Sequence, residues 1–198
     1  ALLTMVNGEN RHNLEFATAL LSSLDEIEAD ESYSSLILTS NDEKNWSLGI
    51  DLPWMSAKYE ARDKASVREF LEKMDEVFKR MLGFPIPVIG AINGHAFGNG
   101  AILACGCDFL FMRSDRGFFC LPEVDLGIDF IPGLFDLVST KLPRPLFTDL
   151  LLTGRRATAP ELVESGVVKK ACASLDELTS DVFTFAESLQ KQRTIFEK

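Results

Sequence analysis

The sequence predicts an α/β fold, in which helices connect the strands of a sheet. Apolar runs with strand character occur at 35–39 and 88–92, and segments with the apolar spacing of helices precede and follow them. Strands separated by helices favour crossover connections and an α/β architecture. The chain has 198 residues, of which 46% are hydrophobic, so it is long enough to bury a core, and we expect residues 1–198 to form a single domain.

The first half of the chain is predicted to contain two helices and one strand. Apolar residues recur at helical spacing over 14–27, and the β-rich run 35–39 follows after an acidic turn. The clearest helix is predicted over 66–81. Its first four residues have the form of a capping box, an apolar stripe runs along it, and Gly83 and Pro85 end it.

The second half continues this alternation. A buried strand is expected at 88–92, followed by a glycine turn, a helix from about Asn99 and another apolar run at 109–112. Later helices are expected to begin at Thr158 and Ser174, because the four residues from each position have capping-box form. A short strand is predicted between them, at 167–168.

Composition and charge exclude several classes of protein. The formal net charge of -10 argues against general binding to nucleic acid or to an anionic membrane, because an acidic protein repels phosphate. No apolar stretch approaches the roughly 20 residues of a membrane span, and the start of the chain lacks a basic leader. We therefore expect no membrane insertion and a soluble intracellular protein, located in the cytoplasm or, in a eukaryote, in peroxisomes or mitochondria.

The cysteines give no sign of a metal or disulfide site. The chain contains no CxxC pair, and two of its four cysteines lie in an apolar run, where buried thiols are common. Reduced core thiols are therefore predicted rather than metal ligands. The four residues are Cys105, Cys107, Cys120 and Cys172.

A glycine-rich segment at 94–100 joins the strand predicted at 88–92 to the next helix. Its glycines allow close backbone approach, and the helix start offers unpaired N–H groups to an anion or a developing oxyanion. Tight packing of helix against strand explains the same glycines equally well. The segment lacks the Gly-Lys-Ser/Thr of a Walker loop and the third glycine of a dinucleotide fingerprint, and the chain has no G-x-S-x-G nucleophile elbow.

Four motifs, taken together, resemble those of the crotonase (enoyl-CoA hydratase/isomerase) family. Residues 46–52, which alone would indicate a plain surface turn, resemble its F-S-A-G-A-D-L signature, and residues 87–100 resemble P-V-I-A-A-V-N-G-x-A-x-G-G-G. Residues 122–128 are similar to P-E-x-x-L-G-I, and residues 152–168 to L-T-G-R-x-x-x-A-x-E-A-x-x-x-G-L-V. Four motifs in the right order across nearly the whole chain are far more specific than any one of them.

The resemblance implies a crotonase-type spiral of ββα turns over about 1–150, a helical part over about 151–198, and assembly into homotrimers or hexamers. It implies an acyl-CoA substrate, with CoA as part of the substrate and no separate cofactor. The backbone N–H groups of Ile50 and Asn99 match those that form an oxyanion hole for the thioester oxygen. Further positions that match substrate and CoA contacts are Trp46, Leu48, Gly49, Asp51, Leu52 and Gly98.

Asn99 departs from the pattern of this resemblance, since the family usually has Gly or Ala there. An Asn tolerates unusual backbone angles, and its side-chain amide offers another donor. It also narrows the expected pocket.

Glu123 is the expected catalytic residue. In the family that this sequence resembles, hydratases carry two glutamates. This sequence has a glutamate at the first of these positions, Glu123, but Ile102 at the second. One carboxylate suffices to remove a proton from C2 of a 3-enoyl thioester and return it at C4, as Δ3,Δ2-enoyl-CoA isomerases do in fatty-acid β-oxidation. Apolar neighbours would raise the pKa of Glu123 towards the working pH. The resemblance therefore favours an enoyl-CoA isomerase.

Other interpretations stay open. Glu123 by itself could be a solvated turn carboxylate, and Asp125 and Asp129 are rival acids. With one of these, the chain could be an enoyl-CoA hydratase or perform another crotonase reaction, such as thioester hydrolysis or decarboxylation. A non-catalytic acyl-CoA-binding subunit is an alternative from a different class.

The remaining candidates have less specific signals. His95 stands beside the glycine turn, where a structural role is favoured over a catalytic one. The apolar residues at 130–137 either wall an acyl-chain tunnel or belong to the core. Arg11 and Lys44 precede pocket-forming segments in the resemblance and are the first candidates for contact with the CoA phosphates.

Overall fold

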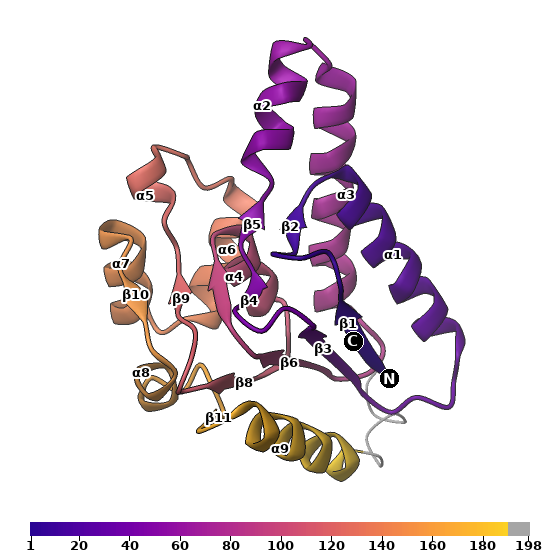
Figure 1. Cartoon of the computed structure of the whole chain (residues 1–198), viewed down its shortest axis with the longest axis vertical. Helices are drawn as coiled ribbons and strands as arrows, with labels where there is room; N and C mark the ends of the chain where they lie inside the picture. The colour runs from indigo at the N-terminus through magenta and orange to yellow at the C-terminus, as the bar shows by residue number, and fades with distance from the viewer. Residues whose placement is uncertain (190–198) are drawn as a thin grey trace.

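The computed structural model describes residues 1–189 and contains a main sheet of parallel strands (Figure 1). Parallel pairing requires crossover connections that run outside the sheet, which agrees with the predicted α/β architecture. The order of the strands across the sheet is β1-β3-β6-β8-β11. Their bounds are Leu2–Met5 (β1), Leu36–Ser40 (β3), Val88–Ile92 (β6), Phe109–Arg113 (β8) and Lys170–Cys172 (β11).

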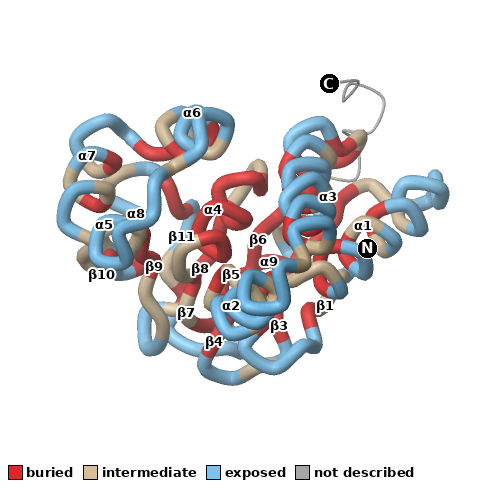
Figure 2. The backbone as a smooth tube through the Cα atoms, turned by 90° about the horizontal axis from the view of Figure 1, so that it is seen from above, coloured by how far each residue is buried: buried red, intermediate tan, exposed pale blue. Residues whose placement is uncertain are grey.

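Apolar side chains cover both faces of this sheet. Helices Leu14–Ala29 (α1) and Lys64–Leu82 (α3) share the larger core, and Leu175–Ser188 (α9) packs over the smaller one. Leu36 and Leu38 lie in the larger core, whereas Ile37 between them lies in the smaller one. Successive side chains of a strand point to opposite faces, and burial on both faces is typical of parallel sheets. Figure 2 shows the buried strands running between the helices.

The first two predicted helices are confirmed, and side chains cap both of them. Asn13 accepts a hydrogen bond from the Phe16 N–H at the start of α1 (3.0 Å). Asp63 accepts one from the Ser66 N–H at the start of α3 (3.1 Å). The second helix therefore begins two residues earlier than predicted, because Asp63 rather than Ser66 is its cap.

Helix Leu52–Glu60 (α2) lies between these two in the chain and projects with α3 away from the main sheet (Figure 1). Asp51 caps it by accepting from the Trp54 N–H at 3.0 Å. None of its residues is fully buried. The helix therefore forms one exposed wall of the molecule.

Two smaller groups of strands lie beside the main sheet. One has the order β10-β9-β7-β4, and in the other β2 pairs with β5 in parallel. Helix Asn99–Cys105 (α4) follows β7 at once and confirms the helix predicted from Asn99. The strands are Asn45–Ser47 (β4), His95–Phe97 (β7), Phe119–Cys120 (β9), Arg156–Ala157 (β10), Arg11–His12 (β2) and Gly49–Ile50 (β5).

Short helices follow β9 and gather on the side of the molecule opposite α1 (Figure 1). They are Glu123–Leu126 (α5), Pro132–Lys141 (α6), Arg144–Thr153 (α7) and Ala159–Glu164 (α8). Thr158 and Ser174 are the N-cap residues of α8 and α9, as predicted.

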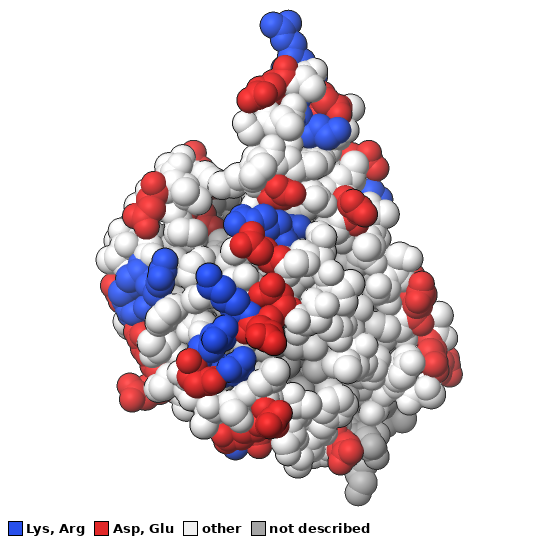
Figure 3. Space-filling model, in the orientation of Figure 1, with Lys and Arg blue, Asp and Glu red and all other residues white. Residues whose placement is uncertain are grey.

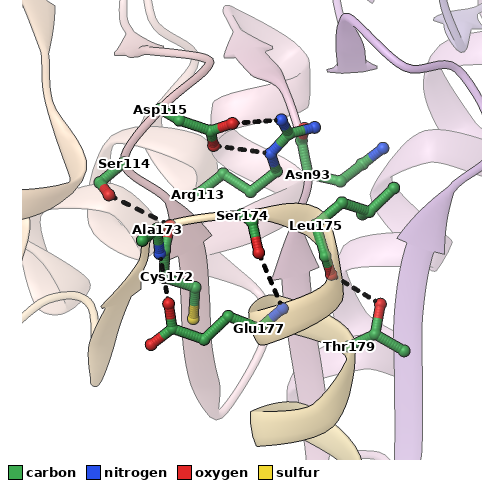
Figure 4. Close-up of polar contacts among 10 residues, drawn as sticks. All are labelled: Asn93, Arg113, Ser114, Asp115, Cys172, Ala173, Ser174, Leu175, Glu177 and Thr179. Carbon is green, nitrogen blue, oxygen red and sulfur yellow. Dashed lines mark hydrogen bonds and ion pairs between the residues drawn. The ribbon is translucent and has the colours of Figure 1, made fainter.

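Figure 4 shows how β11 leads into α9. Ser174 Oγ accepts from the Glu177 N–H at 3.1 Å, and the Glu177 carboxylate accepts from the Ala173 N–H at 2.7 Å. The glutamate therefore binds the N–H of the residue before the cap, one residue earlier than in a capping box. On the other side of β11, the Ser114 hydroxyl donates to Cys172 O at 3.1 Å.

The strand predicted at 167–168 is wrong in position. Val167 and Val168 both donate their N–H groups to Leu162 O (2.9 and 3.0 Å) in the turn after α8. The strand begins at Lys170, where the chain first lies alongside Phe111 of β8. The apolar residues of this buried turn therefore have the sequence pattern of a strand without forming one.

The predicted burial of the cysteines is confirmed. All four cysteines lie within residues 1–189 and are buried free thiols. Burial raises the pKa of Cys105 to about 12, so this thiol stays protonated at neutral pH. Over the same range, none of the helices combines the length and the apolar character that crossing a membrane requires.

Candidate active site

Two chain junctions, β4–β5 and β7–α4, lie in direct contact at the centre of the candidate site. A Cβ atom added to Gly49 would stand 2.7 Å from Phe97 O and 2.8 Å from Asn99 N. Gly49 also has a φ of +74°, which disfavours any other residue. Gly100 packs in the same way against Ser47. The glycines are therefore packing residues, and their packing brings the two junctions together.

Each junction carries one of the predicted N–H donors. The Asp51 N–H donates to His12 O at 2.9 Å, so the N–H of this residue points towards β2. Because successive residues of a strand alternate sides, the Ile50 N–H points away from β2. The Asn99 N–H lies in the first turn of α4, where backbone donors have no acceptor within the helix.

A cavity of about 410 Å³ opens beside these junctions. This volume is within the usual range for small-molecule sites. Its walls come from α3, α4, α5 and the segment leading into α6, and Figure 3 shows the surface hollowed between the projecting α2–α3 pair and the side that carries α5. The predicted residues that line it include Leu48, Ile50, Leu52, Gly98, Asn99 and Glu123.

Glu123 begins α5 on the wall across from β5. Its Oε1 atom lies 3.5 Å from the position that a Cβ of Gly98 would take, so the carboxylate faces the β7–α4 junction. The Oε2 atom is buried and has no hydrogen-bond partner in the described part of the chain. Burial raises the pKa of Glu123, the direction expected from its apolar sequence neighbours. A carboxyl group of this kind, in a cavity, is typical of a general acid or base.

Comparison with known proteins identifies the family. The profile described as Enoyl-CoA hydratase/isomerase matches residues 1–197. The chain belongs to the enoyl-CoA hydratase/isomerase family. Over 182 residues it is 34% identical to "Enoyl-CoA delta isomerase 2, peroxisomal" of Arabidopsis thaliana, covering 89% of this chain and 75% of that relative. Over 197 residues it is 30% identical to "Enoyl-CoA delta isomerase 3" of the same plant, covering 97% and 82%.

Solved structures of this family share the fold. An enoyl-CoA hydratase from a Polaromonas species superimposes with a TM-score of 0.84 at 26% identity, covering 96% of this chain and 73% of that one. An enoyl-CoA hydratase from Bacillus halodurans gives a TM-score of 0.86 at 22% identity, covering 96% and 77%. The predicted crotonase-type α/β fold is therefore confirmed.

The position at which family hydratases were expected to carry a second glutamate is apolar. Ile102 occupies it on α4, lines the cavity and is 3% exposed. Asp129 also lines the cavity, on its exposed side. Asp125 lies against Gly154 instead, since a Cβ there would meet its Oδ2 atom at 2.5 Å. Of the three predicted acids, Glu123 and Asp129 therefore reach the cavity and Asp125 does not.

Three residues that matched family contacts lie behind the cavity wall. Trp46 is fully buried in the larger core, Gly49 forms the contact between the junctions, and Asp51 caps α2. Their side chains therefore support the two junctions. Direct contact of their main chains with CoA stays a prediction.

The two predicted phosphate-binding cations lie in different places. Arg11 lines the cavity and forms an ion pair with Glu9 at 2.7 Å. Lys44 is near His95 on another face of the molecule, where its charge helps to lower the pKa of that histidine. Only Arg11 is therefore positioned to meet a ligand of the cavity.

His95 belongs to an aromatic cluster on the small sheet. Its ring centroid lies 5.0 Å from that of Phe97 and 5.7 Å from that of Phe118, and Arg156 lies over both phenylalanine rings. Burial, and then nearby positive charges, lower the pKa of His95. Figure 3 shows basic side chains gathered over the side of the molecule that carries β9 and β10. The predicted structural role for His95 agrees with this environment.

The apolar stretch at 130–137 is divided between the cavity and the interior. Phe130 and Ile131 line the cavity, as an acyl-chain wall would. Phe135 packs edge-on against Phe147 at 5.1 Å, and Leu137 belongs to the larger core. Leu134 of α6 also lines the cavity, so the change from wall to core lies within that helix.

Sequence reasoning did not identify His12 as part of the site. Its Nδ1 atom lies 2.9 Å from the side-chain nitrogen of Asn99, and the imidazole is fully buried. The available signal was the departure of Asn99 from the family pattern, since a polar side chain introduced into a buried place needs a partner. The separation of 87 residues hid which partner it was.

Proposed function

We propose that this chain isomerises 3-enoyl-CoA thioesters to 2-enoyl-CoA thioesters in fatty-acid oxidation. The observation that carries the proposal is one cavity in which Glu123 faces the Gly98–Asn99 junction while Ile102 replaces a second acid. The names of the Arabidopsis relatives, enoyl-CoA delta isomerases, support the same reaction.

The reaction begins with removal of a proton from C2 of the 3-enoyl thioester by Glu123. The electron pair left on C2 delocalises onto the thioester oxygen and gives a dienolate. Backbone N–H groups of Ile50 and Asn99 donate to that oxygen, and loss of one such donor costs roughly 3–4 kcal/mol of transition-state stabilisation in other enzymes. These donors are therefore what makes a proton next to a thioester acidic enough for a carboxylate to remove.

The second step returns the proton at C4. The C3–C4 double bond becomes single, the C2–C3 bond becomes double, and Glu123 is again a carboxylate. No water is consumed, so an apolar residue at Ile102 favours this route over hydration. Glu123 Oε2 has no partner in the described part of the chain, and the carboxylate accepts a hydrogen bond from the backbone N–H of the same residue. We propose that the reaction needs neither a metal nor a separate cofactor.

The CoA part of the substrate is proposed to lie along residues 46–52, with Arg11 at the cavity as its cation. The acyl chain would extend between α3 and the segment 128–134, where Phe70, Met74 and Phe130 contribute apolar surface. The family resemblance further supports assembly as a homotrimer or hexamer. Sedimentation of the purified chain would distinguish these two states from a monomer.

Hydration of 2-enoyl-CoA is a second candidate function. The solved relatives named above are hydratases, and Asp129 at the cavity is the acid that could replace the missing glutamate. Asp129 is exposed, however, so bulk water would compete with an activated water beside it. We therefore rank hydration second.

The test is to supply purified protein separately with a 3-enoyl-CoA and a 2-enoyl-CoA, and to follow the absorbance of the conjugated enoyl thioester. Isomerisation predicts a rise with the first substrate and no change with the second. A fall with the second substrate, with formation of a 3-hydroxyacyl thioester, would assign the chain as a hydratase. No change with either substrate, while binding is seen by calorimetry, would favour a non-catalytic acyl-CoA-binding subunit.

A further inference from the structure

A continuous set of buried polar groups connects the two junctions of the cavity behind its wall. Asn99 Nδ2 lies 2.9 Å from His12 Nδ1, and His12 Nε2 lies 2.9 Å from Ser47 Oγ. Ser47 Oγ in turn accepts from the Gly49 N–H at 3.2 Å and donates to Asn10 O at 2.8 Å. One imidazole therefore connects Asn99, which carries one proposed donor, through Ser47 to Gly49, which precedes the other at Ile50.

The hydrogen positions in this set follow from counting donors. The single hydroxyl proton of Ser47 is given to Asn10 O, so Ser47 Oγ can only accept from the imidazole. His12 therefore carries its proton on Nε2, which leaves Nδ1 to accept from the Asn99 amide. Every contact then has one donor and one acceptor. The orientation of the Asn99 amide follows from the same count.

The environment of His12 maintains this arrangement. His12 and Ser47 are fully buried, and Asn99 is 7% exposed. Burial lowers the pKa of His12 to about 3, so the imidazole is neutral at physiological pH. The ring also stacks on Phe16 of α1, with centroids 4.4 Å apart. Ring orientation and tautomer are thus both held by contacts outside the cavity.

We propose that His12 and Ser47 are positioning residues that hold the Ile50 and Asn99 N–H groups at a fixed separation for the thioester oxygen. This inference rests on the proposed function, since it concerns the oxyanion hole of that reaction. It assigns a purpose to Asn99, whose amide binds His12 behind the cavity wall. Neither His12 nor Ser47 is proposed to touch the substrate.

The expected effect is on the chemical step. Donors aimed at a developing charge act only if they are held within about 0.5 Å of the productive geometry. Displacement by about 1 Å costs on the order of 100-fold in rate. Removal of the imidazole should therefore lower kcat by about 10- to 100-fold and leave KM nearly unchanged, because the acyl and CoA contacts are elsewhere.

The variants that test this are His12→Leu, Asn99→Ala and the double variant, with His12→Gln as the conservative change. Glutamine can accept from Asn99 and donate to Ser47, so His12→Gln should recover much of kcat. If the imidazole acts through Asn99, the two single losses should not multiply in the double variant. His95→Leu is the matched control, because it removes the other histidine, which does not line the cavity.

A spectroscopic measurement separates this inference from the proposed function. Infrared difference spectra of a bound 2-enoyl-CoA with a ¹³C-labelled thioester carbonyl report polarisation by the donors without turnover. Wild type, Glu123→Gln and His95→Leu should shift the carbonyl band to lower frequency, and His12→Leu should lose most of that shift. Nitrogen-15 NMR of the wild type should show the neutral Nε2–H tautomer of His12. This measurement needs no substituted variant, so it tests the inference even if a variant fails to fold.

Each outcome decides the inference. Loss of the carbonyl shift in His12→Leu, with partial recovery in His12→Gln, supports it even if the wild type isomerises nothing, in which case only the proposed function fails. An unchanged shift in His12→Leu overturns it, whatever the turnover. An Nδ1–H tautomer in the wild type, multiplicative losses in the double variant, or no carbonyl shift in the wild type also overturns it.

Discussion

The two sides of the cavity are built in opposite ways. Behind the donor side, where β5 meets the β7–α4 junction, His12 and Ser47 are fully inaccessible, and hydrogen bonds connect them to Asn99. The acid side, α5, is four residues long, and its Val124 and Leu126 are 48% and 53% exposed. The Glu123 carboxylate accepts a hydrogen bond from its own backbone N–H, and Oε2 has no partner in the described part of the chain.

This difference agrees with the two tasks of a proton shift. Stabilising an enolate requires donors that do not reorganise, and a packed polar network provides them. Moving a proton from C2 to C4 requires a carboxylate that reaches both carbons, and a strong hydrogen bond would oppose that movement. A fixed side and a less constrained side in one cavity are therefore what a single-acid isomerase needs.

The largest expected effect is on the acid side. Glu123→Gln keeps the shape of the side chain but cannot accept the C2 proton, so kcat should fall by about 10²- to 10⁴-fold. Steady-state isomerisation of a 3-enoyl-CoA measures this. Asp125→Asn is the control, because that carboxyl lies against Gly154 and should change kcat less than about threefold. An equal loss in both variants would mean that Glu123 is not the base.

On the donor side, Gly49→Ala should lower kcat by about 10²- to 10³-fold, the usual effect of losing one oxyanion donor. Its Cβ would press on Phe97 O and Asn99 N and move the two junctions apart. Gly166→Ala is matched to it, since Gly166 has a similar φ of +77° but nothing within 4 Å of the added Cβ. Both variants lose stability through backbone strain, so a similar loss of kcat in both would show that strain alone explains it.

The pH dependence distinguishes a buried base from a solvated one. Burial raises the pKa of Glu123. Below that raised pKa, kcat/KM should fall about tenfold per pH unit. The fall should therefore begin at a higher pH than it would with an exposed carboxylate as the base. Because the folded state then holds the proton more tightly than the unfolded state, this group stabilises the fold at low pH. That contribution is lost as pH rises through the raised pKa.

Chemical denaturation of wild type and Glu123→Gln at several pH values checks the sign. The stability of the variant relative to wild type should increase from acidic to neutral pH. A stability difference that is constant over this range, or that changes in the opposite direction, would show that the carboxyl group is not desolvated in the folded protein.

Changing Ile102 on α4 should make the cavity resemble that of a hydratase. Ile102→Glu should lower isomerisation by roughly tenfold and allow measurable hydration of 2-enoyl-CoA, at a cost of about 1–3 kcal/mol for burying a carboxyl group. Ile102→Gln has the same shape without the acid and should gain no hydration. Chromatographic detection of a 3-hydroxyacyl-CoA decides between them, and its formation by the glutamine variant would contradict the role given to the second carboxylate.

The smallest effect is expected at the cavity mouth. Asp129 is exposed, so Asp129→Asn should change isomerisation by less than about threefold and leave the acidic limb of the pH profile in place. Rate measurements from acidic to neutral pH check both. If the acidic limb disappeared, Asp129 rather than Glu123 would be the titrating base.

The parts of this site that are local in sequence were predictable. Glu123, Ile50 and Asn99 lie in short motifs whose glycines and turns determine the local backbone, so a resemblance over a few residues identifies them. His12 and Ser47 could not be found in that way, because 35 residues separate them and each resembles an ordinary polar residue near a turn. Their pairing exists only once β2 lies beside β5.

The same distinction holds for the fold. Helices α1 and α3 were predicted because each buries an apolar stripe, whereas α2 was missed because it buries no residue and carries no periodic signal. The strand expected at 167–168 lies at Lys170–Cys172, because its pairing with β8, and not its hydrophobicity, determines where it begins. Tertiary contact decides such elements.

The most direct test of the single-carboxylate account is the fate of deuterium placed at C2 of a 3-enoyl-CoA during a single turnover in ordinary water. A base in a mainly apolar cavity should return part of the label, so mass spectrometry should find deuterium at C4 of the 2-enoyl product, and Glu123→Gln should form almost none of this product. Product with no deuterium at C4 even at the shortest times, formed equally well by Glu123→Gln, would contradict the account.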